Sequence, residues 1–270
     1  KVPPIAPCLF GSDGMGEKVR IADRINTAPR YTEGDAVRLN NMFRGRDTFE
    51  MLTVVLRDNM LGDAAVVSSF GAQSAVLLNL IASIDPTVAV LFLDTGKHFP
   101  ETITYREDLR SKLGLLDVRI LTPDPKLLQQ KDQTGLRWSY DPDGCCEIRK
   151  VLPLNAALAG FDAQFTGRKA FQSSTRRALP RFEIENGRLK VNPLADWDQP
   201  KIDAYMAEHA LPAHPLVELG YPSIGCSPCT TKVAPGEDPR SGRWKGWDKV
   251  ECGIHNAVTP IGDGSDDPIF

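Results

Sequence analysis

Short apolar runs alternate with longer segments of helical periodicity along most of the chain. The runs are short and rich in β-branched residues, which is typical of buried β-strands. They cover residues 64–69, 87–93, 116–121 and 163–166. Helical patterns are expected at residues 73–83, 101–113, 147–158 and 199–209, with two more helices within residues 36–60. This alternation predicts an α/β fold, a doubly wound and mostly parallel sheet with helices on both faces.

Turn residues mark the later part of the chain. Residues 181–185 and 188–191 are joined by Asn186-Gly187, a dipeptide that favours a β-hairpin. Beyond Pro212 the chain is rich in Gly, Pro and charged residues, and no regular element is expected there. We therefore expect an N-terminal extension over residues 1–35, one α/β domain over residues 36–235 and a mobile C-terminal segment over residues 236–270.

Composition narrows the class of protein. Of the 270 residues, 41% are hydrophobic and 25% are charged, which is ordinary for a globular chain and unlike a disordered one. No apolar run reaches the roughly 18 residues of a membrane span, and no secretory signal is visible. The formal net charge of −3 disfavours nucleic acid as a partner. We expect a cytoplasmic protein, and the sequence leaves open whether it forms a homo-oligomer.

Small and polar residues follow two of the expected strands. Ser68, Ser69, Phe70 and Gly71 lie between a strand and a helix, where free backbone N–H groups favour an anion. Asp94-Thr95-Gly96 follows the next strand and is suited to a ribose or an adenine edge, although an Asp there also suits a plain turn. Ligands of doubly wound sheets bind at this rim.

Four of the six cysteines form two tight pairs. Cys145 and Cys146 are adjacent, and Cys226 and Cys229 form a C-x-x-C. Four thiolates are typical of zinc or of an iron–sulfur cluster. Adjacent cysteines converge poorly on one small ion, whereas a [4Fe–4S] cluster offers separate irons, so the spacing favours the cluster and leaves zinc as the alternative.

A further thiol has basic neighbours in the sequence. Cys252 lies three residues before His255, and Arg240 and Arg243 precede it. A thiolate is a nucleophile, and nearby positive charge favours the thiolate form. Lys150 and Arg176 are further candidates to bind an anion, because guanidinium and ammonium groups suit phosphate and sulfate oxygens. The alternative is a surface thiol among solvated charges.

The ordered motifs SSFGAQ, LDTG, CC-x-x-R-K, GC-x-PC, R-x-x-R-W and ECGIH resemble those of thioredoxin-dependent adenylyl-sulfate (APS) reductases. The resemblance runs from Ser68 to His255. It implies an adenosine-nucleotide fold of the ATP-pyrophosphatase type, and the release of AMP and sulfite from APS. It also implies a thioredoxin or a glutaredoxin-like protein as reductant.

The same resemblance implies roles for individual residues. Cys252 would be the nucleophile that forms an S-sulfonate, with His255 beside it, and the four paired cysteines would hold a [4Fe–4S] cluster. Nucleotide and phosphosulfate would be bound by the remaining candidates: Ser68, Ser69, Phe70, Gly71, Asp94, Thr95, Gly96, Lys150, Arg176, Arg240 and Arg243.

Some alternatives stay open. Lys169, Ala170 and Phe171 stand where family members often have two basic residues and an acid, which bears on whether 3′-phospho-APS (PAPS) is accepted. A PAPS or dual-specificity reductase is therefore the nearest alternative. More distant ones are an ATP-dependent adenylating enzyme, which would usually have S-G-G-x-D-[ST] in its loop, and a zinc-stapled binding module.

Overall fold

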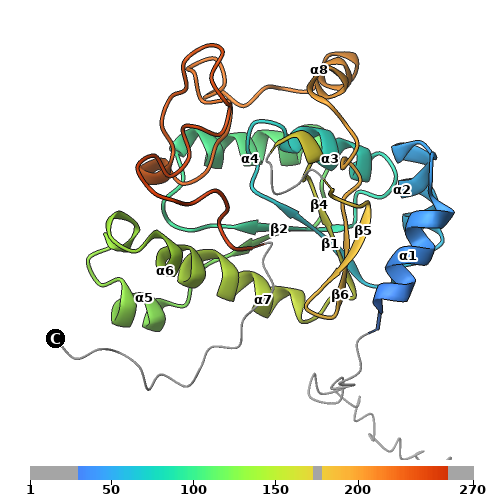
Figure 1. The fold of residues 1–270 in the computed structure, drawn as a ribbon, viewed down its shortest axis with the longest axis horizontal. Coiled ribbons are helices and arrows are strands. Elements are labelled where there is room, and N and C mark those ends of the chain that lie inside the picture. The colour runs from blue at the N-terminus through green and yellow to red at the C-terminus, as the bar shows by residue number, and fades with distance from the viewer. Residues whose placement is uncertain (1–29, 173–177, 255–270) are drawn as a thin grey trace, which may run out of the picture.

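A six-stranded sheet forms the centre of the protein (Figure 1). The computed structural model describes residues 30–172 and 178–254. Its strand order is β3-β2-β1-β4-β6-β5, and every neighbouring pair is parallel except β5 and β6. The strands are β1 Ala64–Ser68, β2 Ala89–Leu93, β3 Val118–Leu121, β4 Ala163–Thr166, β5 Phe182–Glu185 and β6 Arg188–Val191.

The direction of winding reverses beside β1. From β1 the chain moves to β2 and β3 on one side, and then crosses to β4 on the other side of β1. In sheets of this kind the reversal leaves a crevice outside the carboxyl ends of the two strands that flank it. The topology therefore places a ligand site beyond Ser68 and Thr166, the last residues of β1 and β4.

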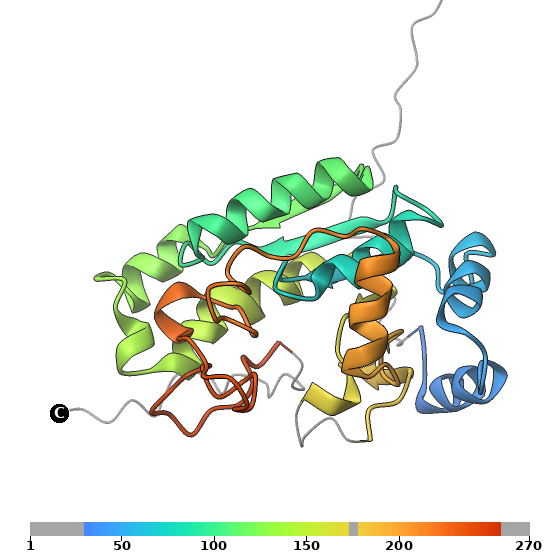
Figure 2. The same ribbon diagram turned by 90° about the horizontal axis from the view of Figure 1, so that it is seen from above.

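Helices cover both faces of the sheet (Figure 2). One face packs a large apolar core that includes Val66, Phe92 and Phe165, and a smaller cluster on the other face joins Leu91 to Leu154 of α7. The helices are α1 Glu33–Met42, α2 Thr48–Arg57, α3 Ser74–Ala82, α4 Pro100–Leu113, α5 Pro125–Lys131, α6 Pro142–Cys146, α7 Leu152–Leu158 and α8 Gln199–Glu208. The sheet is thus buried on both sides, as its continuous apolar strands require.

A π-helical turn, Glu147–Val151, joins α6 to α7. The N–H of Leu152 donates to the carbonyl of Glu147, five residues back. Pro153 follows directly and has no N–H with which to continue a regular α-helical ladder. The sequence predicts one regular helix over residues 147–158, so that prediction has the right place but the wrong start and the wrong internal geometry.

The chain beyond residue 210 is almost entirely irregular. Its one short helix among the described residues is a 3₁₀ turn, Ser227–Cys229. Single β-bridges join Thr230 to Arg243 and His98 to Cys226. In Figure 1 this orange-to-red segment lies beside the carboxyl end of the sheet.

Most predicted elements are confirmed, with ends that shift by one or two residues. The Asn186-Gly187 hairpin is present, and both residues have the positive φ of a tight turn, 52° and 71°. The prediction misses α5, which begins at the N-cap Asp124 and buries none of its residues. Among the described helices, none is long and apolar enough to cross a membrane.

Candidate active site

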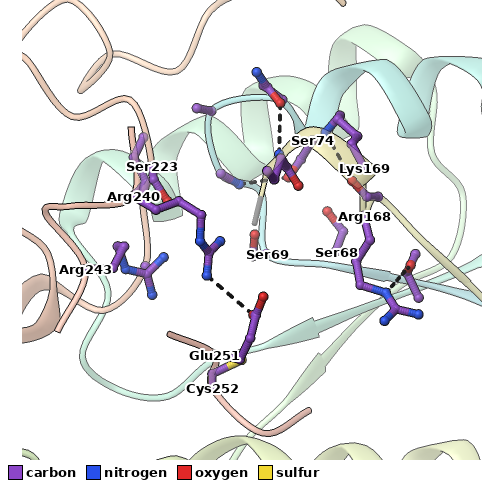
Figure 3. A pocket seen from close by; sticks show the side chains of 18 of the residues that line it. Ser68, Ser69, Ser74, Arg168, Lys169, Ser223, Arg240, Arg243, Glu251 and Cys252 are labelled. Carbon is purple, nitrogen blue, oxygen red and sulfur yellow. Dashed lines mark hydrogen bonds and ion pairs between the residues drawn. The ribbon is translucent and has the colours of Figure 1, made fainter. Parts of the chain in front are cut away.

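A cavity of about 770 Å³ opens at the predicted rim. One side, which we call the strand-end wall, comprises the lining residues within 68–74, at the end of β1, and 167–172, after β4. The other side, the C-terminal wall, comprises the lining residues within 222–225, 238–244 and 251–252. Figure 3 shows side chains of both walls pointing into the space between them. The volume suits a small organic ligand.

The loop after β1 is fixed by its own hydroxyls and by one buried ring. Ser68 Oγ accepts the N–H of Phe70 at 3.2 Å, and Ser74 Oγ accepts that of Gly71 at 2.9 Å. Phe70 has a φ of 47°, an unusual value for a residue with a side chain. Its ring is fully buried and packs edge-on against Phe92, with 5.5 Å between the centroids. The packing of the ring thus holds the loop in a strained turn.

This placement changes the role predicted for Phe70. The sequence groups it with the substrate-binding residues, whereas its side chain belongs to the core. Among the described residues of the cavity lining, Ser68, Ser69 and Gly71 are present and Phe70 is not. The ring shapes the binding loop from behind.

The second predicted loop also lies mainly outside the cavity. Asp94, Thr95 and Gly96 are not among its described lining residues, whereas Leu93 and His98 on either side of them are. Asp94 Oδ1 accepts the N–H of Gly96 at 2.9 Å, which is the turn geometry that the sequence left as an alternative.

Thr95 instead faces the cysteines. It is fully buried, and its Oγ1 lies 3.3 Å from Cys226 Sγ. Its carbonyl accepts a 2.7 Å hydrogen bond from Arg149, which also forms a buried ion pair with Asp132. The strand-end loop is therefore tied to the helix that carries the first cysteine pair.

The four paired cysteines lie close enough for their charges to influence one another. Cys145, Cys146 and Cys226 are buried, and Cys229 is partly buried. Besides burial, negative charge on Cys226 and on Cys229 raises the pKa of Cys145. Negative charge on Cys226 also raises the pKa of Cys146. The charges of the two pairs therefore influence each other, although the pairs are about 80 residues apart in the sequence.

Burial and a neighbouring lysine set the protonation of these thiols. Burial raises the pKa of Cys145, of Cys229 and of Cys146, the last to about 11. For Cys226, burial is outweighed by the charge of Lys150 and the hydrogen bond from Thr95, and its pKa is lowered. Negative charge on the cysteines, Cys226 first, likewise outweighs burial at Lys150 and raises the pKa of that ammonium group.

The four paired cysteines are the type of donor that an iron–sulfur centre uses. The set consists of soft donors only, it is shielded from water, and its two pairs come from a helix and a loop. In the described part of the chain, no three His, Cys, Asp or Glu side chains are grouped so as to hold one metal ion. The agreement with a cluster therefore rests on the type and the burial of the four donors.

Cys252 lies on the C-terminal wall among cations. Arg240, Arg243 and Lys150 line the same cavity. The Nε of Arg243 is buried and has no hydrogen-bond partner among the described residues, and its guanidinium stacks over Trp244 at 4.5 Å. Gly225 allows this position, because a Cβ there would overlap the guanidinium. An unpaired buried donor beside a thiol is suited to an anionic ligand.

Two predicted residues, His255 and Arg176, lie outside the described residues. Other residues were missed by the sequence reasoning and line the cavity: His98, Arg168 and Glu251. Arg168 is one position after Gly167 at the β4 end and forms an ion pair with Glu183 on β5. A basic residue at the rim of a strand was a usable signal for Arg168, whereas nothing in the sequence singles out His98.

Similarity to known proteins agrees with this geometry. The family model described as a phosphoadenosine phosphosulfate reductase domain matches residues 63–232. The adenosine 5'-phosphosulfate reductase of Mesorhizobium japonicum is 48% identical over 241 residues, which cover 89% of this chain and 95% of that protein. The phosphoadenosine 5'-phosphosulfate reductase of Gloeobacter violaceus is 42% identical over 72% of this chain and 83% of that protein.

A solved structure has the same fold. The phosphoadenylyl-sulfate reductase of Candida auris, in a phosphate complex, superimposes with a TM-score of 0.64 at 27% identity, over 76% of this chain and all of that one. The expected nucleotide-binding fold of the ATP-pyrophosphatase type is thereby confirmed. By its sequence and by its fold, the chain belongs to the phosphoadenosine phosphosulfate reductase family.

Proposed function

We propose that this protein is an assimilatory APS reductase, an oxidoreductase that converts APS to sulfite and AMP with a thioredoxin-class protein as reductant. The observation that carries the proposal is the position of Cys252, which faces the serine loop across one cavity and has Lys150, Arg240 and Arg243 around it. A thiol among cations opposite a nucleotide-type rim is suited to attack an anionic group of a bound nucleotide.

The two walls divide the substrate between them. The adenosine and its phosphate lie against the strand-end wall, where Ser68, Ser69 and Gly71 supply hydroxyls and a closely approaching backbone. The sulfo group lies toward the C-terminal wall, within reach of Arg243 and Arg240. This orientation directs the sulfur atom at Cys252.

The first step is a transfer of the sulfo group to Cys252. The thiolate attacks sulfur, the new bond is Cys252 Sγ–S, and the bond that breaks joins sulfur to the bridging phosphate oxygen. AMP leaves with that electron pair, and the protein carries Cys252–S–SO₃⁻. Both reactants are anions, so the cations offset their repulsion and stabilise the charge that develops on the bridging oxygen.

The second step is thiol exchange. A thiolate of the reductant attacks Cys252 Sγ and displaces sulfite, which leaves a mixed disulfide between the two proteins. The second thiol of the reductant then reduces that disulfide, restores Cys252 and leaves the reductant oxidised. We place this chemistry in the cytoplasm, where dithiol reductants are maintained.

Cys145, Cys146, Cys226 and Cys229 would hold a [4Fe–4S] cluster. When bound, the cluster would supply fixed charge beside the reaction without changing redox state in the scheme above. Lys150 connects the two sites, because its charge lowers the pKa of Cys226 and its side chain lines the cavity that contains Cys252. Its part is to hold positive charge at the position of the sulfo group.

PAPS reduction is the second candidate, favoured by the name of the Gloeobacter violaceus relative. The extra 3′-phosphate would need further cations near the ribose. Arg168 on the strand-end wall is already paired with Glu183 and bonded to Asn192, so its charge is largely compensated. We therefore favour APS, as the cysteine pairs also do, and a comparison of kcat/KM for the two nucleotides tests this choice.

The central test is detection of the covalent intermediate. The protein is mixed with APS without any reductant, digested, and analysed by mass spectrometry for SO₃ on the peptide that contains Cys252. The adduct is expected in the original protein, and its loss with release of sulfite is expected when a thioredoxin is added. A fully loaded, nucleotide-binding protein that forms no adduct would rule out the scheme.

A further inference from the structure

Glu251 is a carboxylate within the cationic part of the cavity. It directly precedes Cys252 and lines the same wall. In Figure 3 its side chain points up from the chain into the cavity, toward Ser69 and Arg240, while Cys252 lies below it. Its side chain is 17% exposed, so its charge is only partly screened by water.

Arg240 binds this segment through two groups. Its Nη2 donates to the carbonyl of Val250 at 2.6 Å and lies 3.4 Å from Glu251 Oε2. The Arg240 side chain is 21% exposed. The guanidinium that is assigned to the phosphosulfate is therefore already in an ion pair with the residue next to the nucleophile.

An anionic ligand and Glu251 compete for the same positive charge. The carboxylate points into the space between Arg240 and the serine loop, which is where the proposed function puts the anionic oxygens of the nucleotide. Two negative groups there repel each other, and only one of them is covalently attached. A ligand that accepts the Nη2 hydrogen bond of Arg240 must displace the carboxylate.

We propose that Glu251 is a specificity-determining residue that selects against negative charge at this end of the cavity, by competing with the ligand for Arg240. The inference rests on the proposed function, because it takes the ligand to be an anionic adenine nucleotide. The carboxylate lowers the affinity for the product AMP, which favours its release.

Removal of the charge should tighten the binding of anions alone. For Glu251→Gln we expect the Kd for AMP to fall about tenfold, while that for uncharged adenosine stays the same. Glu251→Asp keeps the charge on a shorter side chain, so AMP binding should lie between the two. The matched control is Asp238→Asn, because Asp238 lines the cavity and accepts the backbone N–H of Arg240 without pairing with its guanidinium.

Isothermal titration of each purified, cluster-loaded variant with AMP and with adenosine provides the readout, and thermal unfolding confirms that each is folded. The inference is overturned if Glu251→Gln binds AMP like the original protein, if adenosine binding tightens as much as AMP binding, or if Asp238→Asn has the same effect. If the original protein binds neither nucleoside nor nucleotide, it is the proposed function that fails.

Discussion

The two walls of the cavity are built in different ways. The strand-end wall follows β1 and β4, and its conformation is set by buried side chains such as Phe70, which is 0% exposed. The C-terminal wall is irregular chain, held by turn hydrogen bonds such as that from Trp244 N–H to the Cys229 carbonyl at 3.1 Å. The strand-end wall is suited to recognition, and the C-terminal wall carries the thiol that, in the proposed function, meets first a nucleotide and then a protein.

The most direct way to test the roles of the two walls separately is to remove the nucleophile. Cys252→Ser should lower turnover by at least about 1,000-fold, because the hydroxyl replaces the only thiol assigned to attack. AMP binding should change little, because this substitution leaves the strand-end wall, Arg240 and Glu251 in place. Sulfite release and AMP titration measure the two effects, and a variant that still releases sulfite would contradict the assignment.

The next test removes one cysteine of the C-terminal half. Cys226→Ala should lose bound iron and its colour, because a four-thiolate site with three ligands left holds a cluster poorly. Cys252→Ser is the control and should keep its iron. Iron analysis of both anaerobically purified variants measures the loss. A full iron complement in Cys226→Ala would count against the proposed ligand set.

The strand-end wall can be tested by a substitution in the hydrophobic core. Phe70→Ala removes a fully buried ring and should lower the free energy of unfolding by about 3–5 kcal/mol. Phe171→Ala is the control, since that ring is 47% exposed and its loss should cost less than about 1 kcal/mol. Urea unfolding measures both, and equal losses would show that Phe70 does not act through burial.

The chain that leads to the C-terminal wall should respond to acid. Burial lowers the pKa of His214 to about 4 from 6.5, although Glu101 partly opposes the shift. The ring is fully buried between Thr102 Oγ1, at 3.1 Å, and the N–H of Leu216, at 3.2 Å. Between pH 6.5 and 4 the unfolded chain binds a proton that the folded chain excludes.

The free energy of unfolding should therefore fall as pH falls through that window, by about 3 kcal/mol in total. Urea unfolding at several pH values measures the slope. His214→Gln cannot titrate and should flatten it, whereas an unchanged slope would show that other groups are responsible.

The sequence predicts the strand-end wall better than the C-terminal wall, for physical reasons. Apolar runs such as residues 64–69 identify a buried strand directly, and a parallel sheet then places the loops that follow. No periodicity describes chain that is held by single bridges and turns. The approach of Arg243 to Gly225, or of Glu251 to Arg240, depends on distances that only the folded chain reveals.

Individual residues show the same limit on what the sequence can predict. Cys145 and Cys226 can be recognised from their chemistry and spacing, and in the fold the charge of Cys226 influences the pKa of Cys145. Phe70 has the motif of a binding loop, yet its ring is in the core, because a sequence does not say to which side a loop residue points. Asp132, the buried partner of Arg149, lies in an unremarkable polar stretch and gave no signal.

The π-turn at Glu147–Val151 contains one more residue than an α-helical turn, which limits how the length of this helix can be altered. Within one turn, Arg149 reaches Thr95 and Asp132 while Lys150 reaches the cavity. Deletion of a single residue there would restore an ordinary helical pitch and rotate everything upstream by about 100° relative to α7. The position of Cys145 and Cys146 relative to α7 therefore depends on the π-turn, and deletion of one residue there should displace this cysteine pair.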